Sequence, residues 1–72
     1  MSNLVDNIIA YESGEMTAEE MVYFFAELVK TGQAWTLQGH YGRTAHRLIE
    51  MGIIIENGDI DEMTAIENGI NL

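Results

Sequence analysis

The spacing of apolar residues along the chain predicts short helices separated by glycines. The first helix is predicted over residues 3–12, where the apolar side chains fall on one face at helical spacing: Leu4, Val5, Ile8 and Ile9. Ser2 or Asn3 offers an N-cap for this helix. The pair Ser13-Gly14 offers its end, because glycine readily adopts the left-handed conformation that closes a helix.

A second helix is predicted from Thr17 to Gly32. Thr17 is followed three residues later by Glu20, the spacing of a capping box. Gly32 suits the position just beyond the last turn. Between them runs a broad apolar stripe made of Met21, Val22, Phe24, Phe25, Leu28 and Val29. The stripe is wider than the core of so small a chain needs, which predicts a homo-oligomer.

The middle of the chain predicts a short helical turn, a loop and a third helix. Residues 33–38 form the turn, with Trp35 and Leu37 in the core. Residues 39–42 form the loop, since glycine stands at both ends. Residues 43–51 form the third helix, whose inward side chains are Ala45, Leu48, Ile49 and Met51.

The last twenty residues leave two structures open, a hairpin or a helix. Three isoleucines followed by Asn57-Gly58 are a hairpin signal, whereas Asp61 suits the N-cap of a tail helix over residues 61–68. The whole chain, residues 1–72, is therefore predicted to be a single small domain. Its fold class is mainly α, with three or four short helices in a compact arrangement and room for a short β-hairpin near residues 53–60.

Composition narrows the function. The chain has 72 residues, a net charge of −9 and no cysteine, so it has neither a disulfide framework nor a thiolate metal site. Its start lacks a basic segment and a long apolar run, which predicts a cytoplasmic protein outside the membrane. The acidic charge disfavours nucleic acid and anionic lipid. It permits a basic protein partner, and the alternative is that the charge only keeps the protein soluble.

The stretch "GHYGRTAHR" contains both histidines and two of the three basic residues. With a helix beginning after the glycines, free backbone N–H groups and one-turn-apart arginines would form a cradle for an anion. The candidate ligand- or partner-binding residues are Trp35, Gln38, Gly39, His40, Tyr41, Gly42, Arg43, Thr44 and Arg47. The alternative is structural: the arginines pair with the chain's own carboxylates and the glycines only permit a turn.

Catalytic and metal chemistry find little support in the sequence. His40 and His46 are six residues apart, which does not match the spacing of a helical metal-ligand pair. No nucleophile stands near a base and an orienting group. We therefore expect a protein that is not an enzyme and has no metal or cofactor. The order of helix, helix and hairpin also resembles a winged helix, although Glu56, Asp59 and Asp61 in the wing would repel phosphates.

The segment "TGQAWTLQGHYGRTAHRLIEMG" resembles a family of small uncharacterised phage-encoded proteins that share the core "TG-x-AW-x-LQG-x-YGRTA-x-x-LI-x-x-G". The segment "IIAYESGEM" is similar to the start of those proteins, so the resemblance spans residues 8–53. It implies phage origin and a location in the cytoplasm of the infected bacterial host, without implying any chemistry. The tail beyond Gly52 is least covered by it.

Three functions stay open at this point. The first is a phage accessory protein that acts by non-catalytic contact with a host or phage protein, modulating a host or anti-phage defence component. The second is an oligomeric sponge for a small anionic ligand, such as a nucleotide signal, held by the "GHYGRTAHR" segment. The third is a winged-helix-like regulator that binds DNA, which the charge disfavours.

Overall fold

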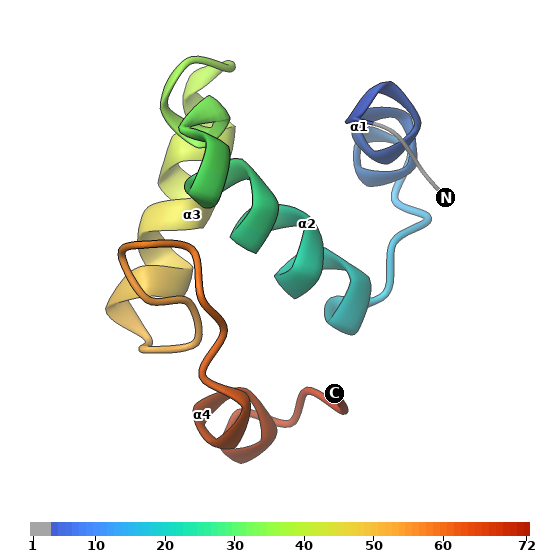
Figure 1. The fold of residues 1–72 in the computed structure, drawn as a ribbon. Helices are drawn as coiled ribbons and strands as arrows, with labels where there is room; N and C mark the ends of the chain where they lie inside the picture. Colours follow the sequence, from blue (N-terminus) through green and yellow to red (C-terminus); the bar gives the residue numbers. More distant parts are fainter. Residues whose placement is uncertain (1–3) are drawn as a thin grey trace.

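The computed structural model describes residues 4–72 as a small, mainly helical domain, as the sequence predicts (Figure 1). Within residues 4–72, four α-helices and one short 3-10 helix follow one another. They are α1 (Leu4–Glu12), α2 (Ala18–Thr31), η1 (Gln33–Trp35), α3 (Gly39–Glu50) and α4 (Glu62–Glu67).

Helix α2 lies at the centre of the fold. The Oγ1 atom of Thr17 accepts a hydrogen bond from the Glu20 N–H at 3.1 Å, and the Thr17 N–H donates to the Glu20 carboxylate at 2.9 Å. The predicted capping box is thus confirmed. Hydrogen bonding to the Glu20 carboxyl, by the Thr17 backbone first and its side chain second, lowers the pKa of Glu20. Gly32 closes the helix with φ +82°. The predicted stripe is buried apart from the half-buried Met21.

Helix α3 and η1 pack against α2 and complete the core. Gly42 allows the close approach of η1, because a Cβ atom at position 42 would lie 3.4 Å from the Ala34 carbonyl oxygen. The residues that join the α2 stripe in the core come from every later part of the chain: Ala34, Tyr41, Ala45, Ile53, Ile54 and Ala65. The core therefore depends on contacts between segments far apart in sequence.

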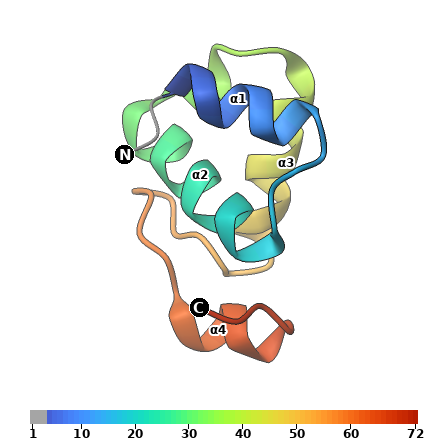
Figure 2. The same ribbon diagram turned by 90° about the vertical axis from the view of Figure 1, so that its right-hand side faces the viewer.

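Helices α1 and α4 lie at opposite ends of the molecule (Figures 1 and 2). No residue of α1 is fully buried. Leu4, Ile8 and Tyr11 pack partly against the core, whereas Val5 and Ile9 are 63% and 59% exposed. Only half of the predicted apolar face of this helix is thus covered. The predicted caps at Ser2 and Asn3 lie outside the described residues.

The predicted loop at residues 39–42 is wrong, because α3 already begins at Gly39. Neither Gly39 nor Gly42 has a positive φ, so both take up helical backbone. The Tyr41 N–H donates to the Gln38 carbonyl at 2.9 Å and forms part of the first turn. These glycines leave space for neighbouring atoms where the sequence suggests a helix break.

The predicted hairpin is reduced, within the described residues, to one antiparallel bridge between Ile54 and Ile60. The pairing cannot continue because Asp61 begins the next helix: its side chain accepts a hydrogen bond from the Thr64 N–H at 3.1 Å. The tail helix predicted from Asp61 is confirmed as α4. Residues 53–72 therefore contain a tight turn followed by a helix.

Two large apolar residues predicted to face the core lie at the surface. Trp35 is 53% exposed, and Ala34 is the buried residue of η1. Met51 is 43% exposed because α3 ends at Glu50 and the chain turns away at Gly52 with φ +80°. Both residues enlarge the apolar part of the surface.

Candidate functional site

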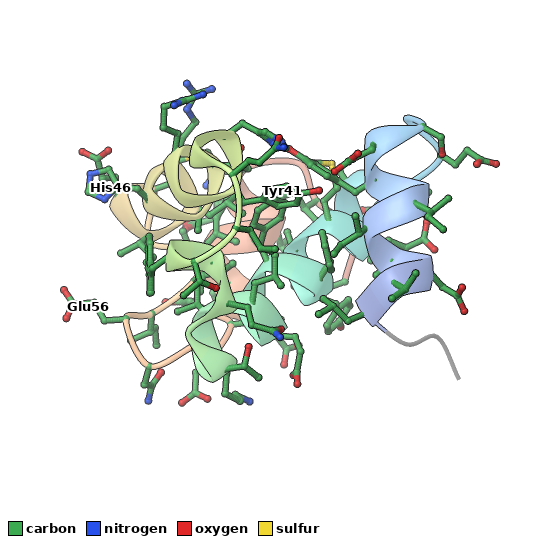
Figure 3. All side chains as sticks on the ribbon, turned by 90° about the horizontal axis from the view of Figure 1, so that it is seen from above. Tyr41, His46 and Glu56 are labelled. Atoms are coloured by element: carbon green, nitrogen blue, oxygen red, sulfur yellow. The ribbon has the colours of Figure 1, made fainter. Side chains whose placement is uncertain are left out.

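The structure divides the predicted site between the inside and the outside of α3. Tyr41 points into the domain toward α1 (Figure 3). It is 2% exposed, and its hydroxyl donates a hydrogen bond to the Glu12 carboxylate. Burial, followed by this hydrogen bond, raises the pKa of Tyr41 above its ordinary range. Tyr41, one of the candidate binding residues, is therefore buried inside the domain, where it attaches α1 to the core.

His40 packs against the rings of Tyr11 and Tyr41, and these three rings form an internal aromatic group. Its ring lies 4.1 Å from the ring of Tyr41 and 6.0 Å from that of Tyr11, measured between centroids. The Thr44 hydroxyl donates to the His40 carbonyl at 2.8 Å, so this hydroxyl satisfies a backbone group of its own helix. The structure thus gives His40, Tyr41 and Thr44 packing and hydrogen-bonding roles within the fold.

Arg43 and Arg47 lie on the exposed side of α3. Within residues 4–72 neither forms an ion pair, and the one ion pair there joins His46 to Glu50 at 3.2 Å, with both side chains 67% exposed (Figure 3). The alternative that the arginines pair with the chain's own carboxylates is therefore not realised among these residues. Two guanidinium groups remain available to a partner or ligand.

The predicted anion cradle at the start of the third helix is not formed as expected. Because α3 begins at Gly39, the backbone of Arg43 belongs to its second turn, whereas the free N–H groups belong to the first. A Cβ atom at position 39 would lie 3.0 Å from a guanidinium nitrogen of Arg43, so this side chain folds back over Gly39. Trp35 lies against α3 at Gly42, with 3.7 Å from its Cε3 to a Cβ at that position. Gln38 is exposed at the N-cap.

A surface that the sequence does not predict lies along α2. A hollow of about 590 Å³ is lined by residues of α2 and of the segment 55–62. A smaller hollow of about 240 Å³ lies where α2 meets residues from α1 and the following loop. Tyr23 and Glu27 line both hollows, so the two form one continuous surface. We call this the α2 surface.

The α2 surface combines apolar and acidic side chains. In its larger hollow the apolar lining is Tyr23, Ala26, Ile55 and Ile60, and the charged lining is Glu27, Lys30, Asp59 and Glu62. Tyr23 is 53% exposed and Ile55 is 49% exposed. The only sequence signals for this site are Tyr23, which stands outside the buried stripe of α2, and the third of the three consecutive isoleucines.

Residues 4–72 contain no group of three or more metal-ligating side chains close enough to hold a metal ion. Among the same residues, no helix is both long enough and apolar enough to cross a membrane.

The fold and these surfaces define a small, acidic helical domain with exposed apolar side chains. The chain belongs to the family described as Domain of unknown function (DUF7417), which it matches over residues 1–69. Comparison with curated proteins and with solved structures gives no match. The family membership covers nearly the whole chain and leaves the function to be argued from the surface.

Proposed function

We propose that this protein acts by non-catalytic contact with a partner protein, through the α2 surface. The observation that carries the proposal is the continuity of the two hollows across Tyr23 and Glu27. Exposed apolar side chains gathered around a hollow are typical of protein-binding surfaces. A half-exposed tyrosine between two hollows is the kind of anchor that carries much of the binding energy in an interface.

The charge of the chain favours a basic partner. A net charge of −9 produces a negative potential over much of the surface, which accelerates encounter with a basic protein and repels an acidic one. The resemblance to phage proteins supports the finer proposal: an accessory protein in the cytoplasm of an infected bacterial host, directed at a host or anti-phage defence component. The exposed apolar residues also support self-association of this chain.

A small anionic ligand is the second candidate. It is favoured by Arg43 and Arg47 of α3, which form no ion pair within residues 4–72. Both arginines come shortly after Gly42, the residue of α3 against which Trp35 packs. A guanidinium group binds phosphate or carboxylate with two parallel hydrogen bonds. The DNA-binding alternative stays a prediction, and the acidic turn bearing Glu56, which points away from the domain in Figure 3, argues against it.

Native mass spectrometry of the tagged protein, purified from a bacterial host lysate, tests the proposal. The variants are Tyr23→Ser, which removes the proposed anchor, and Arg43→Ala, which removes one of the two arginines of the anionic-ligand candidate. We expect a partner protein at fixed stoichiometry with the wild type and with Arg43→Ala, and its loss with Tyr23→Ser. Equal capture by Tyr23→Ser and wild type would contradict the α2 surface. A bound small molecule that disappears in Arg43→Ala would favour the second candidate.

A further inference from the structure

We infer that the larger hollow of the α2 surface binds a cationic amphipathic segment of the partner, with large apolar side chains flanked by arginine or lysine. This inference rests on the proposed function and specifies the chemistry of the partner. The volume of about 590 Å³ lies within the roughly 300–1,000 Å³ range typical of sites that enclose a ligand of many atoms. It is therefore large enough for several side chains of a peptide.

The apolar lining of the hollow accounts for the apolar part of the segment. Ala26 is buried, Ile60 is half-buried, and Tyr23 and Ile55 are about half exposed. These four side chains meet in one hollow although they come from α2 and from both arms of the turn. Covering them with an aliphatic side chain removes apolar surface from water on both partners, which is the main favourable contribution to such binding.

The acidic lining of the hollow accounts for the cationic part. Glu27 comes from α2, Asp59 from the turn and Glu62 from the first turn of α4. None of the three carboxylates forms an ion pair with another residue in the described range 4–72. Lys30 is the one basic residue that lines the hollow, so acidic groups outnumber basic ones by three to one. A segment carrying arginine or lysine on both sides of its apolar residues complements this acidic lining.

The wall of the hollow is formed before any partner arrives. Gly58 lies against the backbone of α2, since a Cβ atom there would be 2.9 Å from Cα of Lys30. The turn is closed by hydrogen bonds from the Ile55 N–H to the Asp59 carbonyl at 2.7 Å and from the Gly58 N–H to the Ile55 carbonyl at 2.8 Å. Because this turn is already ordered, binding does not have to order it, which reduces the entropic cost of binding.

Fluorescence anisotropy with two labelled peptides tests the inference at about 0.15 M salt. The probe is RLLKRLLK, and the control is RSSKRSSK, which has the same charge without the apolar side chains. The groove variant combines Glu27→Gln, Asp59→Asn and Glu62→Gln. The matched control variant, with the same change in net charge, combines three exposed carboxylates that do not line the hollow, as E19Q, E50Q and E67Q.

We expect the groove variant to bind RLLKRLLK about tenfold more weakly than wild type, the effect of losing three partly exposed ion pairs. The control variant should stay within about twofold, because distant exposed charges are screened at this salt concentration. Equal weakening by both variants, or equal affinity for the two peptides, would overturn the inference. Circular dichroism of each variant verifies that the comparison is made between folded proteins.

The outcome also separates this inference from the proposed function. If Tyr23→Ser abolishes partner capture while RLLKRLLK does not bind, the α2 surface is a contact site. The inference that a cationic segment occupies the hollow is then wrong. If RLLKRLLK binds at the groove and no partner depends on Tyr23, the proposed function fails instead. Self-association that blocks the peptide and disappears in R43A/R47A would identify a second copy of this chain as the occupant and also overturn the inference.

Discussion

Replacing Gly58 by alanine tests how firmly the turn at residues 55–60 is held against α2. Gly58 has φ +95°, and a Cβ atom there would lie 2.7 Å from Cβ, and 2.9 Å from Cα and the backbone nitrogen, of Lys30. Gly32 is the matched control: it has a similar φ of +82°, but a Cβ atom there would meet nothing within 4 Å. The two substitutions share the backbone strain and differ in the contact.

The left-handed conformation costs alanine about 1–2 kcal/mol, and the smaller freedom of alanine in the unfolded chain offsets about 0.4–1 kcal/mol of this. Gly32→Ala should therefore lower the free energy of unfolding by about 1 kcal/mol. Gly58→Ala adds contacts with a helix backbone that cannot rotate away. Overpacking of this kind costs about 1–3 kcal/mol, so we expect a total loss of about 2–4 kcal/mol.

Urea unfolding followed by far-UV circular dichroism measures both losses. A 72-residue domain has a total stability of about 4–11 kcal/mol, so Gly58→Ala should remove a large part of it while leaving a measurable transition. Equal losses for Gly58→Ala and Gly32→Ala would refute the reasoning. The turn would then move away from α2 at little cost, and the larger hollow would not have a fixed wall.

Three further predictions concern the helices and the core. Tyr41→Phe removes the hydrogen bond to Glu12 and should cost about 1.5 kcal/mol in urea unfolding. The pKa of Tyr41 is raised in the folded state, so its contribution to wild-type stability should be complete below about pH 10 and fall above it. This fall should be smaller in Tyr41→Phe. Parallel curves of stability against pH for the two proteins would contradict the buried phenol. Thr17→Ala should cost about 1 kcal/mol, with Thr17→Ser largely restoring it, because the N-cap oxygen is what matters. Phe25 is 0% exposed, so Phe25→Ala should lower the free energy of unfolding by about 3–5 kcal/mol. Thermal unfolding of this variant near the wild-type temperature would contradict the central position of Phe25 in the core.

The elements with local signals were predictable from the sequence. Thr17 and Glu20 determine the start of α2, because they are three residues apart and hydrogen-bond to each other. Asp61 determines the start of α4 through a bond to Thr64, also three residues away. The start of α3 was not predictable in this way. Gly39 and Gly42 usually indicate a break, and only the contact of Gly42 with η1 explains why a helix needs glycine there.

The candidate site was less predictable than the fold. Trp35 belongs to a 3-10 helix of three residues, which is too short for an apolar period to indicate which side chain is buried. The larger hollow joins α2, the turn and the start of α4, and nothing in the spacing of those segments shows that they meet. Similarly, whether Arg43 finds an internal carboxylate depends on the three-dimensional positions of side chains, which composition does not determine.

The attachment of α1 has a consequence for hydrogen exchange. This helix has no fully buried residue, and its connections to the core include the Tyr11 ring, 5.2 Å from that of Phe25, and the Glu12–Tyr41 hydrogen bond. Segments with few buried contacts open at a lower free energy than the whole domain. The amides of α1 should therefore exchange through a local opening that leaves α2 and α3 folded, and each such opening briefly exposes the aromatic group beneath it to solvent.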